Sequence, residues 1–272
     1  MPILILIAGG ALVGAFGSLL GLGGGLLIVP FLTLGLDVPI REAVGISLVC
    51  VVMTSSASAA VYLDRRIANF RLGVTLELAT AIGALAGAMI AFAVPERGLA
   101  ALFATLLVYA AVSMARRRPA IARESIPEGT GPSDAVRPFP ESVLAGAGYR
   151  ARRLGLGLVG SLVAGVVSAL LGVGGGIVKV PLMNLAMDVP LRVATATSNL
   201  MIGVTAAAGA IVYLVRGGLD PTVAGPTAIG VFAGASVASR AAHRIDVRLL
   251  RALFVGVMLY TAALMAARAI GL

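Results

Sequence analysis

Residues 172–176 read Gly-Val-Gly-Gly-Gly, and residues 21–25, which lie 151 positions earlier, read Gly-Leu-Gly-Gly-Gly. Both phrases lie in hydrophobic sequence, and each is followed by Val-Pro and then by Asp-Val-Pro. Between 14–49 and 165–200, about 16 of 36 aligned positions are identical. The chain is therefore a duplicated unit whose two halves carry glycine breaks at matching places, an arrangement typical of membrane transporters.

The composition of the 272-residue chain is that of a membrane protein. It is 59% hydrophobic and only 12% charged, whereas soluble domains average about 25% charged residues. No segment alternates as barrel strands do, so we expect an all-α polytopic membrane protein. The net charge of +9 comes from arginines at the ends of apolar runs, where topology explains them better than nucleic-acid binding does. With one cysteine, Cys50, and one histidine, His243 in a basic loop, we expect no metal and no cofactor.

The apolar runs predict five helical elements in each half of the chain. Eight of the ten are long enough, or nearly so, to span a bilayer. The other two, 26–36 and 177–187, follow the glycine phrases, and eleven residues of helix rise only about 16 Å. We therefore expect two half-helices that begin inside the membrane. The ten segments are 2–20, 26–36, 40–63, 70–94, 98–115, 153–171, 177–187, 191–215, 221–242 and 247–270.

The arginine-rich loops predict the orientation of the two halves. In the first half the loop near 64–71 is basic and that near 95–98 is not, whereas in the second half 240–251 is basic and 216–220 is not. If basic loops are cytoplasmic, the halves are inverted repeats, as an odd number of elements requires. The alternative is parallel halves with four crossings each, which would place one strongly basic loop outside.

Three regions follow from this pattern. Residues 1–115 form the first membrane repeat, 116–152 a polar, arginine- and proline-rich cytoplasmic linker, and 153–272 the second membrane repeat.

The glycine breaks are the predicted substrate site. Unpaired backbone N–H groups and the positive dipole end at each half-helix start favour an anion, and glycine lets a ligand approach closely. The competing interpretation is that these glycines serve tight helix packing. The predicted binding residues are Gly23, Gly24, Gly25, Gly174, Gly175, Gly176, Lys179, Ser47, Ser198 and Asn199.

Lys179 is the only lysine in the chain and lies in the second half-helix, where its counterpart in the first half is Ile28. A cation at membrane depth is usually functional, so we expect it to coordinate the anion; the alternative is a lysine that snorkels to the interface. Ser47 and Ser198 occupy matching positions on the next helices and could donate to substrate oxygens, or could instead bond helix carbonyls.

Three charged residues are candidates for gating or coupling. Arg41 and Arg192 match in the two halves, and each follows an Asp-x-Pro phrase that first indicates a turn with the arginine at an interface. The alternative is that they form gating ion pairs with Asp37 and Asp188. Glu77 is the only acidic residue well inside an apolar run, and it could carry a coupling proton if buried. Pairing of Glu77 with Arg71 at the interface is an equally good interpretation.

The motifs resemble the sulfite exporter TauE/SafE family, also called the toluenesulfonate uptake permease family. The resemblance rests on the two glycine phrases with Val29-Pro30-Phe31-Leu32 and Val180-Pro181-Leu182. Residues 194–199, Ala-Thr-Ala-Thr-Ser-Asn, are similar to the family's Ala-x-Gly-Thr-Ser phrase, with Ala196 where glycine is usual. The first half departs further, because 43–47 read Ala-Val-Gly-Ile-Ser and lack the threonine.

The resemblance implies a secondary transporter that exports sulfite or an organosulfonate. Together with the predicted site at the glycine breaks, it favours alternating access around a midplane anion site. The alternatives are an anion channel, or a transporter of a non-sulfur organic anion, on the same scaffold. An enzyme is not expected, because no nucleophile-plus-base pattern and no carboxylate pair lies in an apolar run. We expect a multi-pass protein of a bacterial inner membrane whose partners are a small anion, the bilayer and, as one option, a second copy in a homodimer.

Overall fold

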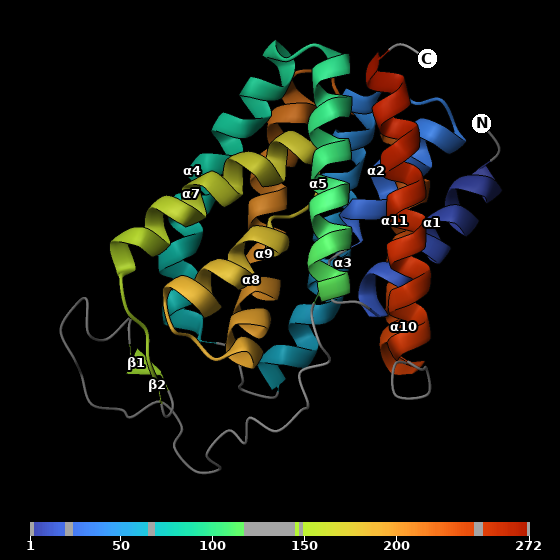
Figure 1. Ribbon diagram of the computed structural model, residues 1–272. Helices are drawn as coiled ribbons and strands as arrows, with labels where there is room; N and C mark the ends of the chain where they lie inside the picture. The colour runs from blue at the N-terminus through green and yellow to red at the C-terminus, as the bar shows by residue number, and fades with distance from the viewer. Residues whose placement is uncertain are drawn as a thin grey trace.

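The computed structural model describes residues 3–19, 24–64, 69–116, 145–146, 149–241 and 247–270. These residues form a bundle of helices, drawn in Figure 1. In the first half the helices are α1 (Ile3–Leu19), α2 (Gly25–Gly35), α3 (Ile40–Asp64), α4 (Phe70–Ala93) and α5 (Glu96–Arg116). In the second half they are α7 (Leu154–Leu171), α8 (Gly176–Pro181), the π-helix η1 (Leu182–Ala186), α9 (Leu191–Val215), α10 (Pro221–Ala241) and α11 (Val247–Ile270). A two-residue strand pair, β1 (Ala145–Gly146) and β2 (Tyr149–Arg150), precedes α7.

The helical content and the half-helices confirm the predicted all-α class. α2 has 11 residues, and α8 with η1 has 6 and 5. Within the described residues, six helices are long and apolar enough to cross a membrane: α4, α5, α7, α9, α10 and α11. α1, with 17 residues, and α3 are not among them, so the eight expected full spans are confirmed only in part. α3 packs against α9 and α10, and it buries Ser47, Thr54 and Ser55, because a helix surrounded by protein does not need a uniformly apolar surface.

Both half-helices begin at glycines that hold the backbone in the left-handed region. Gly24 precedes α2 with φ 76°, and Gly175 precedes α8 with φ 75°. Only glycine adopts this conformation without steric cost. The turns after the half-helices match as well, since Asp37 and Asp188 have φ 53° and 55°. The predicted Asp-x-Pro turns are therefore present in both halves.

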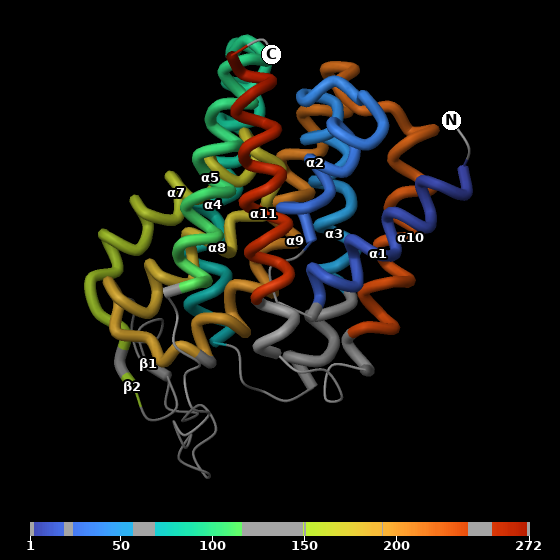
Figure 2. Tube along the Cα trace, turned by 45° about the vertical axis from the view of Figure 1, so that its right-hand side comes forward, coloured from blue at the N-terminus to red at the C-terminus, as the bar shows by residue number. Residues whose placement is uncertain are grey.

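The main helix contacts join the two halves of the chain. α1 packs against α10 and α4 against α7, while α3 packs against α9 and α5 against α11. The 151-residue repeat makes α1 the counterpart of α7 and α4 the counterpart of α10, so the contact of α1 with α10 corresponds to that of α7 with α4. It also makes α3 the counterpart of α9 and α5 the counterpart of α11, so each of the other two pairs joins a helix to its own counterpart. In Figure 1 α4 and α7 lie together, and in Figure 2 α1 and α10 do. The packing pattern is therefore unchanged when the two halves are exchanged.

Glycines allow these helix pairs to approach backbone to backbone. A Cβ added at Gly165 of α7 would lie 2.0 Å from the carbonyl oxygen of Thr80 in α4. At the matching position in the other half, a Cβ at Gly14 would lie 2.3 Å from the carbonyl oxygen of Val231. Small residues at helix contacts are the usual means of packing in membranes, where lipid is as apolar as leucine.

The outward faces carry the large apolar residues. On α4, exposed side chains recur three or four residues apart at Leu78, Ile82, Leu85 and Met89. The opposite face of the same helix buries small residues. This distribution is the reverse of that in a soluble bundle and matches a helix whose outer face contacts lipid.

We predict that Gly165→Ala destabilises the protein, because the new methyl group overlaps the backbone of α4 and the helices must separate. An overpacked contact of this kind costs about 1–3 kcal/mol. Gly256→Ala is the matched control, since a Cβ at this position in α11 meets nothing within 4 Å. Thermal unfolding in detergent should give a lower Tm for the first variant and an unchanged or higher Tm for the second. Equal Tm values would contradict the close packing of α4 on α7.

Candidate functional site

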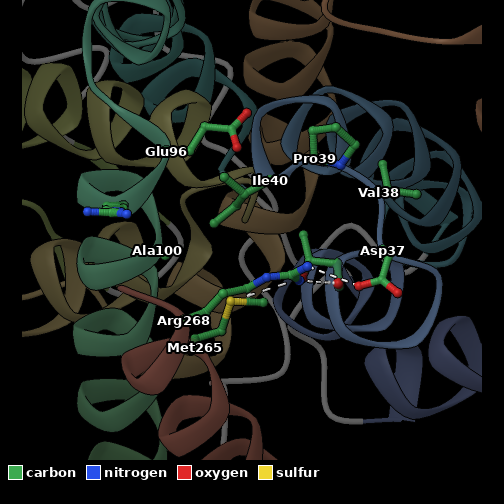
Figure 3. Close-up of a pocket in the computed structure, with 10 residues that line it drawn as sticks. Asp37, Val38, Pro39, Ile40, Glu96, Ala100, Met265 and Arg268 are labelled. Atoms are coloured by element: carbon green, nitrogen blue, oxygen red, sulfur yellow. Dashed lines mark hydrogen bonds and ion pairs between the residues drawn. The ribbon is translucent and has the colours of Figure 1, made fainter. Parts of the chain in front are cut away.

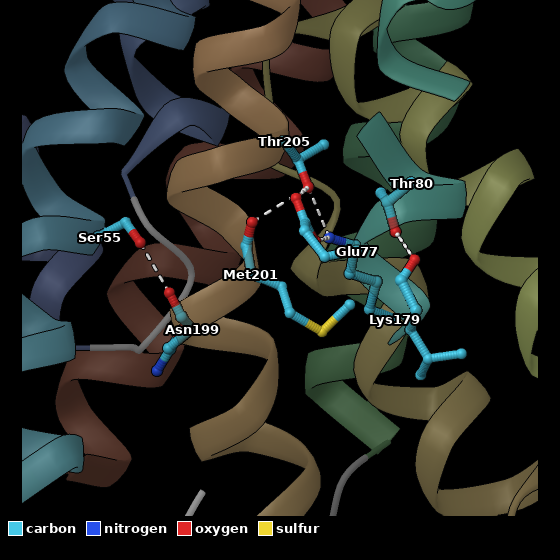
Figure 4. Close-up of polar contacts among 8 residues, drawn as sticks. Ser55, Glu77, Thr80, Lys179, Asn199, Met201 and Thr205 are labelled. Carbon is cyan, nitrogen blue, oxygen red and sulfur yellow. Dashed lines mark hydrogen bonds and ion pairs between the residues drawn. The ribbon is translucent and has the colours of Figure 1, made fainter. Parts of the chain in front are cut away.

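Lys179 lies in the first turns of α8 and is buried, with 1% of its surface exposed. Its Nζ lies 3.0 Å from Oε2 of Glu77 on α4 and 2.7 Å from Oγ1 of Thr205 on α9. Figure 4 shows the three side chains converging from three helices. The lysine does not snorkel to an interface, and Glu77 pairs with it and not with Arg71, so both of those alternatives are wrong.

The Thr205 hydroxyl closes the contact into a triangle. Its Oγ1 donates to Glu77 Oε1 at 2.6 Å and accepts from Lys179. The same hydroxyl lies 3.1 Å from the carbonyl oxygen of Met201 in the previous helical turn, a second acceptor for its single proton. Every charged group of the triangle therefore has a partner, as buried polar groups require.

The counterpart of this triangle in the other half of the chain is apolar apart from one hydroxyl. Lys179, Glu77 and Thr205 correspond to Ile28, Ala228 and Thr54. Ile28 and Ala228 are buried, with 0% and 5% of their surfaces exposed. The same helix packing thus forms without a charge pair, so the fold does not require Lys179 and Glu77. Because burying two ions costs more desolvation energy than apolar residues do, their presence indicates function.

The two glycine breaks touch one another at the centre of the bundle. A Cβ added at Gly25 would lie 2.4 Å from the carbonyl oxygen of Gly172. Ser47 holds this contact, since its hydroxyl lies 2.7 Å from the Gly172 oxygen and 3.2 Å from that of Gly25. In this conformation Ser47 bonds backbone carbonyls, which is the alternative that its sequence position left open. Gly23 lies outside the described residues.

Two hydroxyls beside the start of α8 have no hydrogen-bond partner among the residues that the structure describes. They belong to Ser198 on α9 and Ser168 on α7, and both are buried. A Cβ at Gly176 would lie 3.7 Å from Ser198 Oγ, and one at Gly175 would lie 3.5 Å from Ser168 Oγ. Two donors therefore stand unused at the predicted anion position.

Ser168 is not among the residues predicted from the sequence, although its difference from the matching residue of the first half could have identified it. It replaces Gly17 at the matching position of the first half, so its hydroxyl is not a feature of the repeat. Asn199, by contrast, contributes its backbone carbonyl, which accepts from Ser55 Oγ at 2.6 Å. In Figure 4 its side chain points away from that bond.

Arg41 does not pair with Asp37. Its guanidinium donates to the carbonyl oxygens of Ala91 and Val94, at 3.3 and 2.9 Å, and so caps the end of α4. Asp37 instead pairs with Arg268 of α11 at 3.0 Å. The alternative of an Asp37–Arg41 gating pair is therefore wrong for this conformation, because Arg41 donates to carbonyls that the end of α4 leaves free. The side chain of Arg192 lies outside the described residues.

A cavity of about 290 Å³ opens where α2 ends and α5 begins. Arg268 extends across it in Figure 3, donating to Asp37 and to the carbonyl oxygen of Thr33. Arg97 and Glu96 line its other side. No sequence pattern selects Arg268, because it lies near the end of α11 and reaches α2 only through the tertiary fold.

Most of the chain is similar to proteins named as probable membrane transporters. The family described as sulfite exporter TauE/SafE matches residues 6–265. The chain belongs to this family. It is 28% identical over 227 residues to the probable membrane transporter protein YunE of Bacillus subtilis (strain 168), covering 80% of each chain. It is 29% identical over 220 residues to the probable membrane transporter protein MJ0441 of Methanocaldococcus jannaschii, covering 79% of this chain and 72% of the relative. No solved structure matches the chain.

Membership of the TauE/SafE family confirms the resemblance drawn from the glycine phrases. With its apolar helices, it makes the chain a multi-pass membrane protein of a transporter family.

We predict that the charge pair can be removed as a unit but not one residue at a time. Lys179→Ile or Glu77→Ala alone leaves a buried ion unpaired, at a cost of about 3–5 kcal/mol. The double variant carries the residues of the other half. Its free energy of unfolding should lie within about 1 kcal/mol of that of the wild type, because apolar residues replace a buried ion pair at little cost. Denaturant or thermal unfolding of the four proteins measures the cycle. Additive losses in the double variant would show that the two residues do not act as a pair.

Proposed function

We propose that this TauE/SafE family member is a secondary transporter of a small sulfur-containing oxyanion, such as sulfite or an organosulfonate. It would release the anion from a bacterial cell across the inner membrane. The anion would bind where α8 begins, beside the contact of the two glycine breaks. One observation carries the proposal: α8 buries the only lysine of the chain, and two buried hydroxyls without partners among the described residues lie beside the glycines at which the same half-helix begins.

The chemistry of this position suits a tetrahedral oxyanion. A sulfonate presents three oxygens, and it needs donors from several directions. The ammonium of Lys179 has three N–H donors, and each serine hydroxyl supplies one. Ser168 and Ser198 approach from α7 and α9, on either side of the α8 N-terminus. First-turn N–H groups and the positive end of the helix dipole would add to the attraction.

Alternating access would follow from an inverted repeat. Five elements per half would put the two halves in opposite orientations, and the exchange pattern of the helix pairs supports a two-fold relation between them. In the described conformation Ser47 holds the glycine breaks together. We expect them to separate when the anion binds, because donors now bonded to the protein must turn to the substrate.

Calorimetric titration of the purified protein in detergent tests this function. The panel is isethionate, sulfoacetate, sulfite, sulfate, taurine and acetate. We expect saturable binding of a sulfonate or sulfite by the wild type and none by the Glu77→Ala/Lys179→Ile variant, which keeps the fold but lacks the cation. Ser198→Ala should raise the Kd about tenfold or more, since a hydrogen bond to an ion contributes about 1.5–3 kcal/mol.

Thr54→Val is the control for loss of a buried hydroxyl away from α8, because Thr54 lies beside Gly24 at the start of the other half-helix and bonds the Val51 carbonyl at 3.0 Å. It should bind as the wild type does. If no sulfur anion binds, the proposed substrate class is wrong. If the double variant binds as tightly as the wild type, the proposed site is wrong. Counterflow exchange in proteoliposomes then separates a transporter from a channel, which shows none.

A further inference from the structure

We propose that Glu77 couples transport to protons: the substrate anion and the Glu77 carboxylate compete for Lys179, and one proton binds Glu77 when the anion takes its place. The inference rests on the proposed function and adds its coupling ion and stoichiometry. The anion and the proton would then cross the membrane in the same direction.

The first step is the occupancy of Lys179. In the described conformation its ammonium already has an anionic partner, since Glu77 Oε2 lies 3.0 Å from Nζ. The carboxylate therefore occupies the position at Lys179 that a substrate oxygen would take. One N–H of the ammonium donates to Glu77 and another to Thr205, and the carboxylate already balances the charge of Lys179. An arriving anion therefore competes with the carboxylate for the same buried cation.

The second step is charge. Lys179 and Glu77 together are neutral, and both are buried, with 1% and 8% of their surfaces exposed. If an anion joined them without a proton, the site would carry a net negative charge in apolar surroundings, which is costly. A proton on Glu77 removes this cost, and the anion then balances Lys179 alone.

The third step is the hydrogen bonds of the protonated state. Thr205 now donates to Glu77 Oε1 at 2.6 Å and has a second acceptor, the Met201 carbonyl oxygen, at 3.1 Å. When Glu77 is protonated, its O–H can donate to Thr205 while the threonine hydroxyl rotates to Met201. Rotation of the Thr205 hydroxyl therefore keeps Glu77 and Thr205 hydrogen-bonded whether Glu77 is charged or protonated, and no backbone movement is needed.

No other acid among the described residues near Glu77 competes for this proton. α7, which packs against α4, contains no titratable side chain. α9 contains Arg192 at its start and Tyr213, whose hydroxyl bonds the Ala169 carbonyl at 3.1 Å. α8 contains Lys179, and α4 itself has only the exposed Arg71 besides Glu77. The proton taken up from water on one side and released on the other is thus assigned to Glu77.

The competition fixes the sense of coupling. A monovalent anion and a proton carry no net charge together, so the membrane potential does not act on their joint movement. An inward proton gradient favours uptake, and export proceeds only when the outward anion gradient exceeds it.

Proton uptake on anion binding tests the inference. Isethionate is the first probe because it is the anion of a strong acid and stays monovalent over the working pH range. In weakly buffered detergent solution with a pH indicator, the wild type should take up about one proton per isethionate bound. Its Kd for isethionate should increase about tenfold for each unit by which the pH is raised, because binding takes up a proton. Glu77→Gln should bind with no proton uptake and with a Kd that does not change with pH. The Glu77→Ala/Lys179→Ile variant is the folded control without binding.

Transport in proteoliposomes gives a second readout. An inward proton gradient should drive isethionate accumulation by the wild type, and a potassium–valinomycin potential should not. Glu77→Gln should keep counterflow exchange but lose the response to the gradient. The other anions of the panel are measured in the same way if isethionate does not bind.

The outcomes separate the two proposals. Binding by the wild type without proton uptake, or proton uptake that persists in Glu77→Gln, overturns the coupling and leaves the proposed function standing. If no anion of the panel binds the wild type, the proposed function fails, and the coupling fails with it. If Glu77→Gln does not fold, the wild-type stoichiometry and the pH dependence of its Kd still decide between the outcomes.

Discussion

A polypeptide break inside a membrane must satisfy its own backbone, because lipid offers no hydrogen bonds. Two such breaks lie at the centre of this protein, and each is supported by the other. The Gly25 backbone approaches the Gly172 carbonyl too closely for a side chain, and Ser47 donates to carbonyls of both breaks. The half-helices can begin inside the bundle only because this contact excludes lipid. Unpaired N–H groups at the start of a helix would be energetically costly in lipid. Inside the bundle, those of the half-helices can be satisfied by a ligand.

Around this centre the two halves repeat their packing but not their chemistry. Glycine contacts between α1 and α10 recur between α4 and α7 with nearly the same approach distances. The charge pair of Lys179 and Glu77 occurs on one side only, and Ile28 and Ala228 fill the matching position. A duplicated scaffold thus provides an internal comparison. What both halves share maintains the fold, and what one half alone carries has been added to it.

Two arginines stabilise helix ends by bonding carbonyls that the helices leave free. Arg41 caps α4 through two carbonyls, and Arg268 bonds the Thr33 carbonyl and Asp37 at the end of α2. Both use a planar guanidinium with several donors, which suits carbonyls that a helix end leaves free. The 290 Å³ cavity that Arg268 crosses lies at the end of α2, so the half-helix has this cavity at one end and the glycine contact at the other.

The sequence by itself determined the class of the fold, the half-helices, the glycine breaks and the family. Each of these depends on local features: apolar length, left-handed backbone that needs glycine, and an exact repeat of short phrases. It also selected Lys179 and Glu77 separately, because a charge in an apolar run is informative wherever its partner lies. Only the tertiary structure decided that these two residues pair with Thr205, that Ser168 and Ser198 both lie at the start of α8, and that Asp37 meets Arg268 and not Arg41. These contacts join residues up to 231 positions apart, and they depend on how helices cross, which no local pattern of residues specifies.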